Sequence, residues 1–265
     1  MSVRHLETLS YERRDAGAWV TLTRPDRRNA LHPQLIADLG TALDIALDDR
    51  AVRAVVITGS DGAFCAGADL TFLQSVDADP DEIMAQFLTP LSQLLSRLRQ
   101  IPKPIIAAVN GHCVAGGLEM VLCCDLVVVA ENARIADGHA RFGLLPAIGG
   151  AQGLMRAVGP ALAKEMILTG NAYTGTQMAA AGLASRAVPA ADLESTAAEL
   201  VATIAQCSPS GLRRMKQMLN DEPSMPWELA ARYELAITER HLATNTPAEG
   251  LAAFMEKRAP EFLDE

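Results

Sequence analysis

Short apolar runs alternate along the first two thirds of the chain with longer segments in which apolar residues recur at helical spacing. Ile105–Val109 and Ala54–Thr58 are continuous runs that predict buried strands, and Ala18–Thr23 alternates as a half-buried strand does. His32–Asp49 and Glu82–Arg99 place leucines on one face and predict helices. Because strands and helices alternate, the pattern indicates an α/β fold with parallel strands joined by helical crossovers.

The pattern changes near Asp192. Before this point, further short strands are predicted over Asp125–Ala130, Ala133–Ala136 and Ser185–Val188. Beyond it only helices are predicted, over Asp192–Gln206, Ser208–Asn220, Trp227–Leu242 and Pro247–Arg258. We therefore expect a core over residues 1–191 and a helical region over residues 192–265 that caps the core or serves as an oligomerisation arm.

Two glycine-containing turns follow predicted strands. One is Phe64–Leu70; in the other, Ala115–Glu119, two glycines open an apolar helix predicted over Leu118–Cys124. The first amides of a helix lack partners, and glycine lets a ligand approach the backbone. Two such N–H donors aimed at one oxygen would form an oxyanion hole. The alternative is that these glycines only allow close packing.

One acid, Glu119, lies three residues after Gly116, about one helical turn away. A carboxylate in an apolar helix is costly to ionise unless it is paired, hydrated or functional. Glu119 is therefore the first candidate for acid–base chemistry beside a polarised carbonyl.

Composition narrows the classes of function. The formal charge of -9, without a basic run, argues against nucleic acid as a partner. The five cysteines form no C-x-x-C pair and suggest reduced packing residues in a cytoplasmic protein. No cluster has metal-ligand spacing, and neither phosphate-binding glycine motif is present. No signal peptide or membrane-spanning run is found, so no membrane association is expected.

Several segments, in order, resemble the crotonase superfamily, also called the enoyl-CoA hydratase/isomerase family. They are TRPDRRNAL (Thr23–Leu31), FCAGADL (Phe64–Leu70), KPIIAAVNGHCVAGGLEM (Lys103–Met120), FGLLPAIGGAQGLMRAVG (Phe142–Gly159) and LTGNAYTGTQMAAAGLASRAV (Leu168–Val188). The resemblance implies a crotonase-like spiral of ββα units with a C-terminal helical region, assembled as a homotrimer or a dimer of trimers. It also implies a lyase of the EC 4.2.1 class that hydrates a 2-enoyl-CoA, with coenzyme A as part of the substrate and no separate cofactor.

The resemblance assigns roles residue by residue. The oxyanion amides would be those of Ala68 and Gly116. The remaining contacts to coenzyme A would come from Ala66, Asp69, Leu70 and Thr71 along its path, and from Arg24, Arg28 and Ala30 near its nucleotide. For the arginines, a solvated surface position is the alternative to phosphate contact. Glu119 matches the first of the two catalytic glutamates of the hydratases.

The chain departs from the family at the second glutamate, where His139 stands. Asp137 lies two residues earlier and is expected to point elsewhere. Three interpretations stay open. His139 substitutes as the proton donor or acceptor; or Glu119 alone moves a proton in an isomerisation, decarboxylation or hydrolysis of an acyl-CoA; or the site binds acyl-CoA with little turnover. A histidine that only hydrogen-bonds the loop backbone is the alternative to a chemical role for His139.

Overall fold

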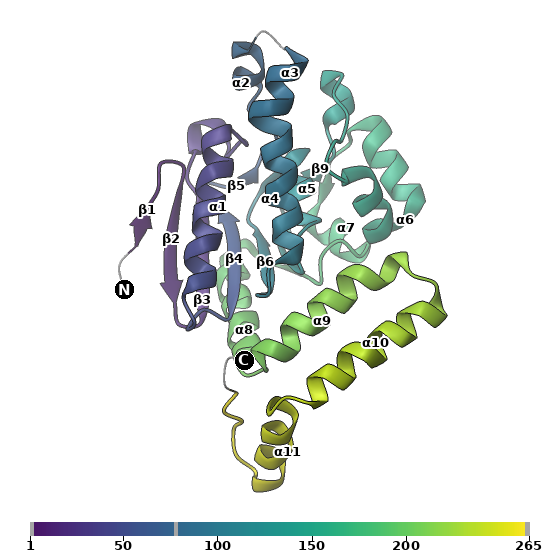
Figure 1. The fold of residues 1–265 in the computed structure, drawn as a ribbon. Helices are drawn as coiled ribbons and strands as arrows, with labels where there is room; N and C mark the ends of the chain where they lie inside the picture. Colours follow the sequence, from purple (N-terminus) through teal and green to yellow (C-terminus); the bar gives the residue numbers. More distant parts are fainter. Residues whose placement is uncertain (1–2, 77–78, 263–265) are drawn as a thin grey trace.

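The computed structural model describes residues 3–76 and 79–262, whose strands form two sheets surrounded by helices (Figure 1). The larger sheet has the strand order β1-β2-β3-β4-β6-β8-β11. Its strands are β1 (Arg4–His5), β2 (Leu9–Arg14), β3 (Gly17–Leu22), β4 (Ala54–Gly59), β6 (Ile105–Val109), β8 (Leu126–Ala130) and β11 (Arg186–Val188). From β3 to β11 all neighbours are parallel, whereas β2 runs antiparallel to β1 and β3. The predicted parallel α/β core is confirmed.

The smaller sheet has the order β10-β9-β7-β5. Its strands are β5 (Ala63–Cys65), β7 (His112–Val114), β9 (Arg134–Ala136) and β10 (Tyr173–Thr174). The successive pairs β4–β5, β6–β7 and β8–β9 each place their first strand in the larger sheet and their second in the smaller one. This repeated step is the ββα spiral that the resemblance implies, and it brings the turns after β5, β7 and β9 to the same edge.

Helices cover both faces of the larger sheet, because alternate residues of its strands point to opposite faces. In β4, Ile57 packs in a core with leucines of the helices over Pro33–Asp48 and Thr89–Gln100. Val56 lies on the other face, in a second buried cluster that includes Val201. The helices are α1 (Pro33–Asp48), α2 (Leu70–Ser75), α3 (Pro80–Ile83), α4 (Thr89–Gln100), α5 (Gly116–Val121), α6 (Gly150–Thr169), α7 (Gly175–Ala180), α8 (Leu193–Ala205), α9 (Pro209–Asp221), α10 (Trp227–Leu242) and α11 (Thr246–Glu256). Within the described ranges, none of them is both long and apolar enough to cross a bilayer.

The C-terminal helices leave the core progressively. α8 packs on the larger sheet, and α9 is held by Lys216, whose Nζ lies 2.7 Å from Asp125 Oδ2 and also donates to Leu98 O and Lys103 O. α10 and α11 extend away from the sheets (Figure 1), and α10 has no buried residue. The tail therefore has apolar surface that the single chain does not cover.

Two predictions differ from the structure, and one pair of strands was not predicted. β1 and β2 form an antiparallel edge that the sequence analysis did not predict, because Leu9 and Tyr11 alternate with polar residues in a charged segment. The helix predicted over Glu82–Arg99 is α3 and α4 joined by a π-helical turn over Met84–Leu88. α5 begins at the glycines and ends at Val121, earlier than predicted.

Candidate functional site

The turns after β5 and β7 lie side by side. Cys65 pairs with Cys113 in parallel register, so both turns start at the same level of the smaller sheet. A Cβ atom at Gly117 would lie 2.3 Å from Cys65 O, and one at Gly116 would lie 4.0 Å from Ala68 N. Only glycine lets α5 begin this close to the first turn.

The backbone N–H groups of Ala68 and Gly116 are available at this junction. Leu31 N donates to Gly67 O at 2.7 Å, and Asp69 N donates to Leu31 O at 2.8 Å. These two hydrogen bonds pair Leu31 with the residues on either side of Ala68 and do not use the N–H of Ala68 itself. Gly116 is the first residue of α5 and has no acceptor within that helix. In the described part of the chain, neither N–H makes one of the hydrogen bonds that fix the loops and caps. Two such neighbouring donors suit an oxygen that gains negative charge.

Glu119 is buried one turn into α5, with only 4% of its surface exposed. Its Oε1 accepts from Ile148 N at 3.0 Å and from Ala147 N at 3.2 Å, so the loop before α6 fixes the carboxylate. A Cβ atom at Gly150 would lie 2.7 Å from the same oxygen. Glu119 also lines a cavity of about 620 Å³ between α5 and α6, whose lining does not include Ala68 or Gly116.

His139 is buried at the turn after β9 and contacts Asp137. The Nδ1 atom of His139 lies 3.1 Å from Asp137 Oδ1, and the same oxygen accepts from His139 N at 3.2 Å. The carboxylate of Asp137 is directed to the histidine by a tight turn through Gly138, a contact that was not predicted. Burial acts to lower the pKa of His139, but the hydrogen bond and charge of Asp137 and the charge of Glu119 outweigh it and raise the pKa above 6.5.

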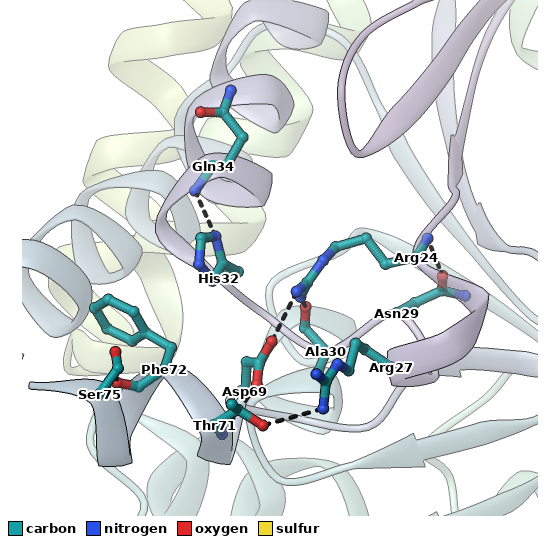
Figure 2. A network of polar contacts seen from close by, with 10 residues as sticks. All are labelled: Arg24, Arg27, Asn29, Ala30, His32, Gln34, Asp69, Thr71, Phe72 and Ser75. Atoms are coloured by element: carbon teal, nitrogen blue, oxygen red, sulfur yellow. Dashed lines mark hydrogen bonds and ion pairs between the residues drawn. The ribbon is translucent and has the colours of Figure 1, made fainter.

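A polar network joins the first predicted motif to the turn after β5 (Figure 2). Arg24 Nη2 lies 2.7 Å from Asp69 Oδ2, and Nη1 donates to Ala30 O. Burial acts to raise the pKa of Asp69, but the hydrogen bond and charge of Arg24 hold it below its usual value. Asp69 also caps α2 by accepting from Thr71 N at 3.0 Å. The charge of Arg24 is therefore already paired within the protein.

The other residues that the resemblance places along coenzyme A lie around this network. Arg28, Leu70 and Thr71 are exposed, Ala66 is half-buried, and Ala30 is buried. The described contacts thus bring together both motifs, at residues 24–31 and 64–71. Contact of these residues with coenzyme A stays a prediction.

Asn29, which was not among the predicted site residues, is fully buried in this network. Its Oδ1 accepts from Arg24 N at 2.8 Å, and its Nδ2 donates to Ala63 O at 2.7 Å. Its φ of 57° is one that asparagine tolerates better than most residues, and its place in a polar turn was the available signal.

The cysteines near the site are packing residues, as predicted. Cys65 and Cys113 are fully buried, and burial raises the pKa of Cys65 to about 12. A thiol that stays protonated is a poor nucleophile. Across residues 3–76 and 79–262, no group of three or more histidine, cysteine or acidic side chains is arranged to hold a metal ion.

The sequence and the fold were compared with those of known proteins, and both resemble the same family. The family described as Enoyl-CoA hydratase/isomerase matches residues 12–265. A probable enoyl-CoA hydratase of Mycobacterium tuberculosis is 36% identical, covering 97% of this chain and 98% of its own length. The 2,3-dehydroadipyl-CoA hydratase of Escherichia coli is 37% identical, covering 92% and 93%. The crystal structure of an enoyl-CoA hydratase from Polaromonas sp. JS666 superposes with a TM-score of 0.92 at 32% identity, covering 96% of this chain and 99% of that one.

Proposed function

This chain belongs to the enoyl-CoA hydratase/isomerase family, and from that premise we propose that it adds water across the C2–C3 double bond of a 2-enoyl-CoA thioester. The observation that carries the proposal is the pair of available N–H groups, Ala68 and Gly116, at the junction of two turns. Both donate to the thioester oxygen and stabilise the enolate that forms when water attacks C3.

Glu119 and His139 move the protons. Glu119 takes a proton from water as the water oxygen bonds to C3 and the π electrons shift into the enolate. The His139 imidazolium then gives a proton to C2 as the enolate returns to the thioester. Transfer of the proton from Glu119 to His139 restores both groups, and the net change is the addition of one water molecule.

Coenzyme A is the part of the substrate through which the protein binds it, and no further cofactor takes part in this scheme. Arg28, Ala30, Ala66, Asp69, Leu70 and Thr71 form its binding path beside the two oxyanion amides. The exposure of Arg28 and Thr71 supports this assignment, because polar groups at the rim can reach phosphates and ribose. Arg24, whose charge is paired with Asp69, acts by fixing the position of Asp69 and the conformation of the turn after β5.

Isomerisation of an enoyl-CoA is the second candidate. The specific observation in its favour is His139, which replaces the second glutamate of the hydratases. A proton relay between Glu119 and His139 could move a double bond without adding water. The products separate the two reactions, since only hydration increases the mass of the acyl group by that of water.

We further propose a cytoplasmic homotrimer or dimer of trimers, in which residues 1–191 form the catalytic core and residues 192–265 make subunit contacts. Support comes from the tail, whose Trp227, Leu235 and Phe254 are 82%, 69% and 80% exposed. Apolar exposure on this scale is typical of an interface rather than of a free surface.

The deciding experiment offers the protein a panel of 2-enoyl-CoA thioesters and follows products by mass spectrometry. Glu119→Gln should lower kcat about 10²–10⁴-fold while coenzyme A still binds, because the amide cannot accept the proton. Glu165→Gln is the matched control, since this glutamate on α6 is exposed and, within the described residues, its carboxylate accepts one hydrogen bond, from Tyr173 Oη. An equal rate in the wild type and in Glu119→Gln would contradict the proposed role.

A further inference from the structure

The Asp137–His139 pair is more enclosed than an ordinary loop contact. The two side chains are 3% and 10% exposed. Gly138, between them, has a φ of 73°, which favours glycine and turns the chain so that one carboxylate oxygen meets both the ring and the backbone N–H of His139. The hydrogen bond therefore fixes both the rotation of the ring and which nitrogen faces Asp137.

The second ring nitrogen of His139 is left for other chemistry. Within the described residues, Nε2 makes no hydrogen bond. It is also not one of the buried polar atoms that lack a partner, so it is not sealed from solvent. The charges that act on the ring are those of Asp137 and, from α5, Glu119. The Arg141 side chain turns instead to Gly170 and Asn171 at the end of α6. One ring nitrogen is thus held by Asp137, and the other makes no hydrogen bond within the described residues.

We propose that Asp137 is a positioning residue that holds His139 with its proton on Nδ1 and stabilises the imidazolium, so that Nε2 exchanges the proton at C2 of the substrate. This inference rests on the proposed function. A carboxylate in contact with a buried imidazole favours its charged form and selects the Nδ1–H tautomer of its neutral form. Asp137 thus favours the protonated ring of His139, the residue that stands where the hydratases carry the second glutamate.

The alternative is that Asp137 only closes the turn, through its bond to His139 N. Asparagine distinguishes the two roles, because its side-chain oxygen can accept the same two hydrogen bonds without the charge. Asp137→Asn should therefore keep the fold and the ring orientation while His139 loses the group that stabilises its imidazolium.

The direction of the pH effect follows from the contacts. His139 donates only when protonated, so kcat/KM should fall as pH rises through its pKa, which lies above 6.5. Removing the negative charge lowers this pKa, and the alkaline limb of the kcat/KM profile should then move to lower pH by about 1–2 units.

The test combines a titration without substrate with kinetics. NMR follows the ring C2 proton of His139, assigned with His139→Gln, in the wild type, in Asp137→Asn and in the control Asp38→Asn. Asp38 is a similarly buried acid that accepts from Thr8 N and Thr8 Oγ1. We expect the pKa of His139 to fall about 1–2 units in Asp137→Asn only. An unchanged value overturns the proposal.

Two further readouts keep the proposal testable. The neutral ring in the wild type should show the Nδ1–H tautomer by ¹⁵N chemical shift, a result that needs no variant, and the opposite tautomer overturns the proposal. If the pKa falls in Asp137→Asn but the kcat/KM profile does not move, Asp137 is only structural. If the wild type converts no 2-enoyl-CoA while the NMR shift is as expected, the proposed function fails and the pairing stands.

Discussion

Gly150 sets the position of the Glu119 carboxylate. The first residue of α6 lies so close to this side chain that a methyl group there would meet Oε1 at 2.7 Å. The same oxygen accepts two backbone N–H bonds from the preceding loop. The location of the acid thus depends on a residue that carries no functional group.

Gly150→Ala should lower kcat about 100-fold, because displacing a reacting group by about 1 Å has effects of that size. The thermal midpoint should change little, since alanine favours a helix. Gly153→Ala is the control on the same helix, where a methyl group would meet only the Leu122 side chain at 3.4 Å. Equal rates for the two variants would show that the carboxylate tolerates the methyl group.

At the scale of elements, one ammonium group joins the helical tail to the core. Lys216, only 7% exposed, connects α9 to the end of α4, to the start of β6 and to Asp125 before β8. Asp125 Oδ2 also accepts from Ile105 N at 2.7 Å. Burial raises the pKa of Asp125, which Lys216 acts to lower. Loss of Lys216 would leave this carboxylate largely uncompensated.

Lys216→Met should reduce the free energy of unfolding by about 3 kcal/mol, measured by urea denaturation near neutral pH. The loss of unfolding free energy should be smaller at acid pH. The folded-state pKa of Asp125 is raised, so Asp125 binds its proton more tightly in the native state than in the unfolded state, and protonation removes its unpaired charge. Lys216→Met with Asp125→Asn should recover part of the stability. An unchanged urea midpoint in Lys216→Met would contradict the anchoring role.

The sequence predicts elements well where a periodic apolar pattern is long, and poorly where geometry decides. α10 has the predicted bounds, Trp227–Leu242. The two glycine-containing turns and Glu119 could be found because a strand, a turn and a helix follow each other directly along the chain. The contact of Asp137 with His139 could not, because it depends on the left-handed backbone of Gly138. The bond from Ile148 N to Glu119 spans 29 positions and leaves no local signal.

At the scale of the whole molecule, the exposed tail leads us to predict assembly of the chain into an oligomer. α10 and α11 extend from the sheets (Figure 1), and their large apolar side chains would be costly to leave in water. Light scattering after size exclusion should therefore give about three times the 28.2 kDa chain mass, or twice that value for a dimer of trimers.

Phe254→Glu should weaken the assembly, because a charge would replace one of the most exposed apolar side chains of α11. The same measurement should show a smaller mean mass at low protein concentration. Val3→Glu is the control, since Val3 is also exposed but lies outside the tail. A monomeric wild type would contradict the predicted assembly.

The spiral distributes the site over successive coils. The turn after β5 carries Ala68, the turn after β7 leads to Gly116 and Glu119, and the turn after β9 holds Asp137 and His139. In the proposed mechanism, carbonyl activation therefore belongs to the first two coils and the second proton carrier to the third. We therefore expect that substitutions in the last coil would change the reaction while leaving the proposed activation of the thioester in place.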